Sequence, residues 1–234
     1  MNEIRNEILA MLDDDRSQRI LASCERVELG QSEILSEAGR PLDRIIFPIE
    51  GVISILATYA SGDLIEIATV GREGFVGITA LVDGQVQPGT YVVQAAGEAY
   101  VMKRESFDEL VKEDEEFRFL TKRYADVFIY QVMISAACNG AHGVEERLAR
   151  WLLMMIDRSD EPVVKLTHEF LADIINVRRA TITDALKRLE AKGAVRRERG
   201  RIELNNRDEL TETSCDCYEM VSNYRRNAMQ SSVR

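Results

Sequence analysis

Apolar and β-branched residues come in short runs over the first hundred residues, and turn-forming pairs separate the runs. The runs occupy residues 44–48, 51–56, 64–70, 91–94 and 98–102, with Gly62-Asp63, Asp83-Gly84 and Pro88-Gly89 between them. Short strands at such regular spacing are typical of a small antiparallel sandwich or barrel. A helical segment to about Ala22 precedes them. The pattern therefore predicts an antiparallel β-barrel over residues 1–113, a body that holds a ligand in many proteins and is purely structural in others.

From Asp114 the apolar residues recur in alternating steps of three and four, close to a heptad repeat. This inner seam comprises Phe117, Leu120, Tyr124, Val127, Gln131, Ile134 and Cys138. A helix of this length spans roughly 36 Å, and its apolar face is larger than one small barrel covers. We predict that the seam pairs two subunits; the alternative is that it packs on its own barrel. Asn139-Gly140 and Gly143 are predicted to end this helix and to form a hinge.

A helical pair follows the hinge region and a further helix, Val144 to about Arg158. In residues 167–190, two sets of apolar positions recur at the spacing of one buried helix face each. The sets are Phe170, Leu171, Ile174 and Ile175, and then Ile182, Ala185, Leu186 and Leu189. Between them, Asn176 tolerates left-handed backbone angles and Val177 supplies an apolar plug, which suits a tight turn. The pattern predicts a helix-turn-helix.

The second of these helices presents Arg and Thr side chains outward near its start, a chemistry that suits a DNA major groove. Lys192-Gly193 is predicted to stop it, because glycine takes the C-terminal cap position at no steric cost. Residues 194–197 and 201–204 then read as two strands around Arg199-Gly200, which together with the helices form a basic winged helix. The simpler alternative, a solvated helical hairpin without a ligand, does not account for this wing.

The pattern divides the chain into four parts. Because a β-barrel is followed by mainly helical parts, we predict an α+β protein. They are the barrel with its N-terminal helix (1–113), a dimerisation helix with its hinge (114–140), a winged helix-turn-helix domain (141–207) and a C-terminal extension (208–234). The extension has apolar positions at Leu210, Tyr218, Met220 and Val221. We expect it to form a helix that packs against the DNA-binding part, with contact to a partner left open.

Charge is distributed unevenly along the chain. The whole protein of 234 residues has a formal net charge of −10, which by itself argues against a nucleic-acid partner. Residues 165–207, however, contain 11 Lys and Arg against 6 Asp and Glu, a net of +5, whereas the remainder has 19 against 34. Attraction to phosphate depends on the local patch, because salt screens charges beyond roughly 8 Å. The distribution favours DNA binding by the winged part alone.

Several classes of protein are not expected. The chain has no apolar run long enough to span a membrane and no signal peptide, and its four scattered cysteines do not form a secreted disulfide framework, so we expect a cytoplasmic protein. His168-Glu169 lacks the second histidine of the metalloprotease pattern, since position 172 is Ala. Phosphate-binding glycine loops with Lys-Ser/Thr are also missing. We therefore do not expect an enzyme.

The order of these parts resembles the Crp/Fnr family of bacterial transcription regulators over residues 10–205. The anchors of the resemblance are residues 71–77 (GREGFVG) after a strand, residues 146–153 (ERLARWLL) after the hinge, and the helix-turn-helix at 167–190. The resemblance implies a jelly-roll barrel like a cyclic-nucleotide-binding domain, a homodimer on a palindromic promoter site, and a signal in the barrel that repositions the recognition helices. RNA polymerase is an implied partner if the protein activates transcription.

The resemblance implies particular DNA contacts. Arg179 matches the family's Arg that reads guanine, and His168 begins the first helix where family members often contact phosphate or base. Ala180 stands where several members have Glu, and Asp184 where some have Arg, so the preferred half-site should differ from theirs. The residues predicted to contact DNA are Thr167, His168, Arg178, Arg179, Ala180, Thr181, Thr183, Asp184, Lys187, Arg188, Arg199 and Arg201.

The sensor site matches the family less well. Members that bind cyclic AMP close a phosphate cassette with Arg followed by Thr or Ser, whereas this chain has Pro88-Gly89-Thr90. A buried phosphate without its charge-assisted partner is costly, so we expect no tight binding of cyclic AMP. The effector pocket is predicted to involve Gly71, Glu73, Gly74, Gly89, Thr90, Tyr124 and Gln131.

Other cofactors of the family are not expected either. An iron–sulfur sensor needs clustered N-terminal thiolates, and Cys24 stands alone there. A haem sensor needs an axial ligand in the barrel, yet His142 and His168 lie beyond the long helix. Cys215-x-Cys217 offers only two ligands and is interpreted as a pair of ordinary helix residues. We predict no metal, and the effector stays unidentified. The alternative function is a sensor with a cyclic-nucleotide-type domain that acts through protein partners instead of DNA.

Overall fold

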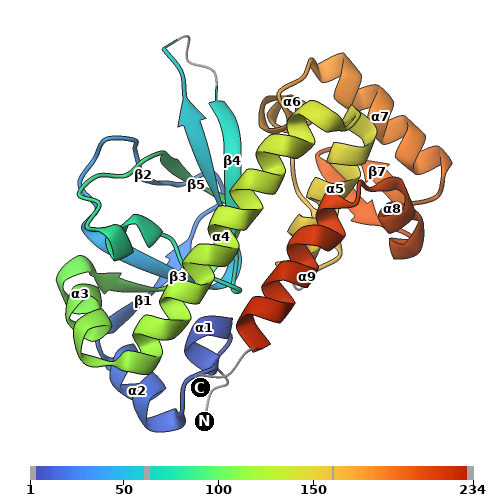
Figure 1. Ribbon diagram of the computed structural model, residues 1–234. Coiled ribbons are helices and arrows are strands. Elements are labelled where there is room, and N and C mark those ends of the chain that lie inside the picture. Colours follow the sequence, from blue (N-terminus) through green and yellow to red (C-terminus); the bar gives the residue numbers. More distant parts are fainter. Residues whose placement is uncertain (1–3, 61–63, 160, 231–234) are drawn as a thin grey trace.

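The computed structural model describes residues 4–60, 64–159 and 161–230, and these form two globular parts joined by one long helix (Figure 1). The N-terminal part begins with α1 (Glu7–Ala10) and α2 (Asp14–Ala22) and continues as an antiparallel sheet. Its strands are β1 (Cys24–Leu29), β2 (Ile34–Ser36), β3 (Arg44–Thr58), β4 (Leu64–Val70) and β5 (Thr90–Lys103), with the short 3-10 helix η1 (Ile78–Val82) before β5. The predicted turn at Gly62-Asp63 lies outside the described residues.

The sheet has the order β1-β5-β3-β4, and β2 pairs with β5. Four of the predicted strands are in fact two: residues 44–48 and 51–56 belong to the single strand β3, and residues 91–94 and 98–102 belong to β5. The register of the two strands shifts on both sides of Gly51, which has a φ of +86°. A Cβ at Gly51 would lie 2.5 Å from the carbonyl oxygen of Ala95. The glycine therefore marks a bulge where long strands bend, and not a turn between short ones.

The sheet curls around an aromatic core that the long helix completes. Phe47, Phe75, Phe107 and Phe117 are fully buried, and adjacent rings lie with centroids 5.3–6.4 Å apart. Phe107 comes from α3 (Arg104–Glu113), and Phe117 opens α4 (Glu115–Ala141). The side chain of Asp114 caps α4 by accepting a hydrogen bond of 3.0 Å from the Phe117 amide. The N-terminal domain is therefore an antiparallel β-barrel closed by a helix, as predicted.

The inner seam of α4 does not face outward. Phe117, Leu120, Tyr124, Val127, Gln131 and Cys138 are all less than 9 % exposed within one chain, and Ile134 packs beside Cys138. The prediction that these residues form the dimer interface is wrong, because the barrel and the C-terminal extension cover them. Heptad spacing identifies an apolar helix face but not what covers it. The helix also continues through Asn139-Gly140, and the break falls at His142-Gly143.

The C-terminal part is a winged helix-turn-helix. It comprises α5 (Val144–Asp157), β6 (Val163–Val164), α6 (His168–Ile175), α7 (Arg179–Ala191), β7 (Val195–Glu198) and β8 (Arg201–Leu204), and the strands pair in the order β6-β8-β7. All the predicted core positions of the two helices are buried except Phe170, which is partly buried. Asn176 adopts the expected left-handed conformation (φ 55°, ψ 59°), and Gly193 follows the second helix with a φ of +78°.

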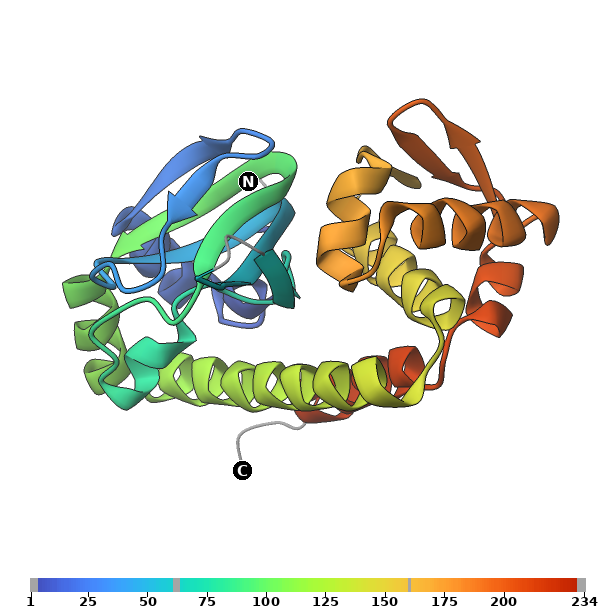
Figure 2. The same ribbon diagram turned by 90° about the horizontal axis from the view of Figure 1, so that it is seen from above.

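The extension forms two helices instead of one. The first, α8 (Arg207–Thr213), packs on α5, as expected, whereas α9 (Cys217–Gln230) runs beside α4 in both views (Figures 1 and 2). The rings of Tyr130 and Tyr224 stack with centroids 4.0 Å apart, and the Tyr224 hydroxyl donates to the carboxylate of Asp126. The extension therefore packs on the DNA-binding part, as expected, but α9 also packs along α4, which was not predicted.

The winged domain also touches the barrel directly. The Trp151 indole on α5 donates a hydrogen bond of 2.7 Å to the Glu66 carboxylate on β4, and the Ser54 hydroxyl on β3 donates to the same group at 2.7 Å. Burial raises the pKa of Glu66 to about 7, although these hydrogen bonds and the nearby Arg150 act to lower it. Glu66 therefore joins the two domains through a carboxyl that titrates near neutral pH.

This contact makes stability depend on pH. The folded protein holds the Glu66 proton more tightly than the unfolded chain, so the stabilising contribution is complete below pH 4.5 and is lost as pH rises through about 7. We expect Glu66→Gln, which cannot ionise, to flatten this fall by on the order of 2 kcal/mol. Urea denaturation of both proteins across this range measures it. Parallel pH curves for the variant and the wild type would contradict the assignment.

Candidate functional site

The start of α7 and the tip of the wing both present exposed basic side chains. Arg178 lies at the N-cap of α7 and Arg179 at its first position, and both are exposed together with Ala180. The positive end of the helix dipole adds to their charge. On the wing, Gly200 has a φ of +72° and turns the chain so that Arg199 and Arg201 lie at the exposed tip. This arrangement can place one helix in a DNA groove and the wing against phosphates.

Three of the predicted contact residues position other groups as well. The Thr167 hydroxyl caps α6 by accepting from the Phe170 amide at 3.2 Å. His168 is half-buried, and its Nδ1 lies 3.1 Å from the Thr183 hydroxyl, which joins the two helices of the motif. Burial and then the charges of Arg197 and Arg179 lower the pKa of His168. The ring is therefore neutral near pH 7 and orients α7 instead of offering a positive charge.

The remaining predicted residues divide into exposed and engaged groups. Asp184 and Lys187 are exposed and pair with each other at 3.5 Å, and Thr181 is partly exposed. Arg188 instead reaches Glu145 on α5, which also binds Lys192 at 2.7 Å. Its guanidinium is thereby held toward α5. On the wing, Arg196 is exposed but was not among the predicted DNA contacts. Successive residues of a strand face opposite sides, so the sequence did indicate that Arg196 or Arg197 would face outward.

The predicted effector residues fall into two separate groups. Gly71, Glu73, Gly74, Tyr124 and Gln131 come together where the barrel meets α4. Gly89 and Thr90 lie elsewhere, against β3: a Cβ at Gly89 would lie 2.9 Å from the Leu56 carbonyl oxygen, and the Thr90 and Thr58 hydroxyls are 3.1 Å apart. The structure therefore does not bring the predicted effector residues together in one pocket.

The space between the residues of the first group is occupied by the side chain of Arg158, which lies at the C-cap of α5. Its Nε donates to Glu73 Oε1 at 2.7 Å, its Nη1 to the Thr69 hydroxyl at 2.6 Å and its Nη2 to Gln131 Oε1 at 2.8 Å. Gln131 in turn donates to the Thr69 carbonyl oxygen at 3.1 Å. All four residues are buried. The space left beside them is about 40 Å³, which holds water and no nucleotide.

The glycines of this region make room for these side chains. A Cβ at Gly74 would lie 1.9 Å from the Tyr124 ring, and one at Gly71 would lie 2.8 Å from Arg158 Cγ. Burial raises the pKa of Glu73, but the Arg158 guanidinium, the charge of Arg225 and the Gly71 amide outweigh it, and the pKa is lowered overall. Glu73 is therefore an ion-paired carboxylate at neutral pH, and this buried pair fixes the position of α5 against the barrel.

A second cavity opens between the barrel and α4. Its volume is about 270 Å³ and its lining is almost entirely apolar. Phe75, Ile78 and Tyr91 come from the barrel side and Phe128 and Met133 from α4. None of these residues was in the predicted pocket, because the sequence pattern does not show which apolar side chains leave space between them.

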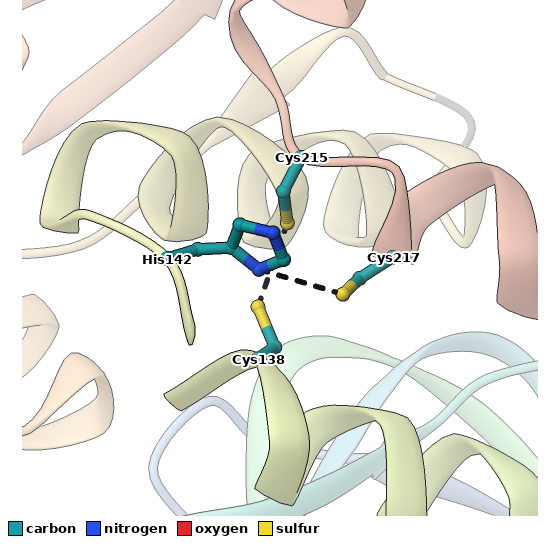
Figure 3. A group of neighbouring side chains, drawn as sticks. All are labelled: Cys138, His142, Cys215 and Cys217. Atoms are coloured by element: carbon teal, nitrogen blue, oxygen red, sulfur yellow. Dashed lines mark hydrogen bonds between the residues drawn. The ribbon is translucent and has the colours of Figure 1, made fainter. Parts of the chain in front are cut away.

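One further cluster was missed. Cys138 and His142 at the end of α4 lie against Cys215 and Cys217, with their ligand atoms all within 4.8 Å of one another (Figure 3). The sequence showed only the second pair as a possible site, since the first pair lies more than seventy residues away. The spacing of Cys138 and His142, one turn apart on a helix, was the available signal.

Comparisons with known proteins agree with this division of the chain. Residues 26–114 match the model of the cyclic nucleotide-binding domain, and residues 146–213 match that of the Crp-like helix-turn-helix domain. The two domains occur in the order and at the separation that the structure shows, on either side of α4. The chain belongs to the Crp/Fnr family of transcription regulators. It is accordingly a DNA-binding transcription regulator.

The following proteins are similar to this chain at low sequence identity. The global nitrogen regulator of Nostoc sp. is 23 % identical over 163 residues, which are 66 % of this chain and 73 % of that protein. FixK2 from Bradyrhizobium japonicum superposes with a TM-score of 0.70 at 16 % identity, covering 82 % of this chain and 98 % of that one. The c-di-GMP responsive global regulator CLP from Xanthomonas campestris gives 0.66 at 18 % identity, covering 83 % and 100 %. These likenesses show a shared fold.

No helix in residues 4–60, 64–159 and 161–230 combines the length and the apolar character that crossing a membrane requires.

The Arg158–Glu73 pair gives a first prediction for the site. We expect Arg158→Met to lower the free energy of unfolding by about 3–5 kcal/mol, because it leaves a buried carboxylate without a counter-charge. Urea denaturation measures this. The contribution of Glu73 is present above pH 4.5 and is lost as pH falls, since its folded pKa is lowered.

Two variants control for this substitution. Adding Glu73→Gln to Arg158→Met should recover part of the loss, because the buried charge is then removed. Arg207→Met breaks the exposed pair with Asp157 next to the same helix end and should cost at most about 1 kcal/mol. Equal losses for Arg158→Met and Arg207→Met would show that the buried network is not a major constraint.

Proposed function

We propose that this regulator acts as a homodimer that reads a twofold-symmetric DNA site with α7 and responds to a signal at the interface between the barrel and α4. The observation that carries the proposal is the exposed start of α7, where Arg178, Arg179 and Ala180 project beside a basic wing. The acidic remainder of the chain opposes non-specific attraction to DNA, so binding depends on this face.

Arg179 is the proposed reading residue. A guanidinium matches guanine O6 and N7 bidentately, which discriminates by about 1–3 kcal/mol. Ala180 can contact a thymine methyl group but cannot accept a hydrogen bond from cytosine, and Asp184 offers a carboxylate where a second Arg would offer donors. The half-site should therefore differ from sites read through Glu and Arg at these two positions. Arg199 and Arg201 are proposed to contact phosphates.

The proposed dimer uses the face of α4 opposite the inner seam. At 100° per residue, Ile129, Met133, Ala136 and Gly140 fall on one outward stripe, about half a turn from Tyr124. The side chains of Ile129 and Met133 are 54 % and 63 % exposed, and Ala136 and Gly140 are exposed as well. Apolar residues at alternating steps of four and three form a seam that a second copy of the helix can cover. Small residues at one end allow close approach there.

The proposed signal site is the apolar cavity of about 270 Å³. It lies between the barrel and α4, and Ile129 and Met133 line both this cavity and the proposed dimer stripe. A ligand there would therefore contact the residues that pair the subunits. Its apolar lining suits a small apolar molecule, and the glycine at position 89 supports the expectation that cyclic AMP is not bound tightly. RNA polymerase is the proposed partner if DNA binding activates transcription.

The reading residue can be tested with a labelled promoter fragment bound by the protein. We expect Arg179→Ala to lose 5- to 150-fold in preference for its site, about 1–3 kcal/mol, while weak salt-sensitive binding persists. Arg188→Ala is the matched control, because Glu145 already holds this guanidinium, and sequence preference should be retained. Unchanged protection of the site by Arg179→Ala would refute this assignment.

A mobility-shift experiment with the same labelled promoter fragment distinguishes the alternative function. A sensor that acts only through protein partners would not bind any duplex under conditions of low salt. In that case the basic wing would have another role.

The dimer face can be tested by sedimentation velocity. We expect Met133→Glu to convert the dimer into a monomer, because it places a charge in the centre of an apolar seam. Met220→Glu is the matched control: Met220 is 42 % exposed on α9 and should tolerate the charge without loss of the dimer. A stable dimer of Met133→Glu would place the interface elsewhere.

A further inference from the structure

Four potential metal ligands converge where the long helix ends. Cys138 lies in the last turn of α4 and His142 at its C-cap, where the His142 amide donates to the Cys138 carbonyl oxygen at 3.1 Å. Cys215 lies in the link between α8 and α9, and Cys217 is the first residue of α9. Figure 3 shows the imidazole and the three thiol groups pointing toward one another from these two segments.

The spacing of the ligand atoms fits one tetrahedral ion. The Sγ atoms of Cys138 and Cys215 are 3.5 Å apart, and Cys217 Sγ lies 3.6 Å from His142 Nδ1. A tetrahedral centre with Zn–S bonds near 2.3 Å separates its sulfur ligands by about 3.8 Å. A disulfide would need about 2.05 Å, so the cysteines are free. Iron–sulfur clusters distribute their ligands over several iron atoms and hold them further apart than this compact set.

The surroundings also suit a bound cation. Cys138, Cys215 and Cys217 are at most 5 % exposed and form an apolar cluster with Ile134, which keeps competing water away. Three thiolates and one neutral imidazole around a divalent ion carry a net charge of −1. Arg147 and Arg150 of α5 are close enough to interact electrostatically with these cysteines, and each has a buried Nε without a hydrogen-bond partner among the described residues. They supply the compensating positive charge.

We propose that Cys138, His142, Cys215 and Cys217 form a structural binding site for one soft divalent metal ion, with Zn²⁺ as the best match. Closed Cys₃His sites are typical of structural zinc, because thiolates and imidazole are its preferred ligands and no position is left open for catalysis. As each metal–sulfur bond forms, the thiol gives up its proton to solvent.

The position of the site gives it a structural role. Two ligands belong to the end of α4, and two belong to the extension that continues from the winged domain through α8, which packs on α5. The ion therefore clamps the extension to the long helix across the break at His142-Gly143. Occupancy of the site sets how freely the winged domain moves about this break.

Cobalt is the first probe. The full-length protein, freed of metal with a chelator under reducing conditions, is titrated with Co²⁺ and then with Zn²⁺. We expect one Co²⁺ per chain, with the intense visible absorption and the thiolate-to-metal charge transfer of a tetrahedral Co²⁺–thiolate centre, and displacement by Zn²⁺. Zn²⁺ should raise the thermal midpoint by on the order of 10 °C at saturating concentration.

Variants assign the ligands. Cys217→Ser should abolish the charge-transfer absorption and most of the Zn²⁺-dependent rise, whereas His142→Cys should retain a tetrahedral site with altered absorption. Cys24→Ser is the matched control, since Cys24 lies on β1 outside the cluster, and it should bind as the wild type does. Circular dichroism of the metal-free variants shows whether each one folds.

The outcomes separate this proposal from its rivals. Metal-free reduced protein that takes up no Co²⁺, or Cys217→Ser that binds Co²⁺ as the wild type does, would overturn it. Purified protein with several irons and acid-labile sulfide per chain would overturn it in favour of a cluster. A Cys138–Cys215 disulfide that is already present in the purified protein and resists the reducing buffer, so that no metal binds, would also overturn it. None of these measurements involves DNA, so failure of the proposed DNA reading leaves their result unaffected.

Discussion

The buried guanidinium of Arg158 is the constraint on which the arrangement of the two domains depends. It ends the helix that opens the winged domain, yet its partners are Glu73 and Thr69 of the barrel and Gln131 of α4. Taking such a charge out of water is costly unless every donor finds an acceptor. Here three nitrogen atoms do so at 2.6–2.8 Å. The barrel, the long helix and the winged domain therefore meet at one side chain, and displacement of α5 would leave two opposite charges buried without partners.

The contact between Arg158 and Glu73 gives the glycine-rich run after β4, residues 71–77, a structural role. The resemblance to the family had placed Gly71 and Gly74 in the predicted effector pocket. In this chain a side chain at either position would collide with Arg158 or Tyr124. The glycines serve close packing between domains, and the volume near Glu73 is consumed by the protein itself. Space for a ligand exists instead in the apolar cavity beside Phe128 and Met133. A signal there would act on α4 and not directly on the ion pair.

Sequence patterns predicted those parts whose structure is decided locally. The helix-turn-helix was placed correctly because Ile182, Leu186 and Leu189 are buried by the neighbouring helix, and because Asn176 marks the turn by its own backbone preference. The prediction that the inner seam of α4 forms the dimer interface failed for a different reason. Periodicity shows that Tyr124 and Val127 share an apolar face, but only the three-dimensional fold decides that the barrel covers it. Residues 44–48 and 51–56 were read as two strands, because a pattern of apolar runs does not distinguish a bulge within one strand from a break between two.

Sequence patterns did not predict contacts between residues that lie far apart in the sequence. Glu66 and Trp151 are 85 positions apart, and neither residue type signals a contact between domains. The same holds for Cys138 and Cys215, which are 77 positions apart. Each pair of cysteine or histidine ligands is too small to indicate a site by itself. The site becomes visible only when α9 turns back along α4, and that reversal follows from packing between Tyr130 and Tyr224 and not from any motif.

The contacts of α5 show how the winged domain is attached to the rest of the chain. Its first turn follows the break at His142-Gly143, beside the cluster of three cysteines and His142. Its last turn is followed by Arg158, which binds the barrel and α4. The Arg147 guanidinium on the same helix donates to the Ile175 carbonyl oxygen at the end of α6, so the DNA-reading helices move with it. A rigid helix held at both ends cannot rotate about the break unless one end is released. The Arg158 end is bound to the barrel, and the other end lies beside the cysteine cluster, so contacts at both ends of α5 fix the orientation of one recognition helix.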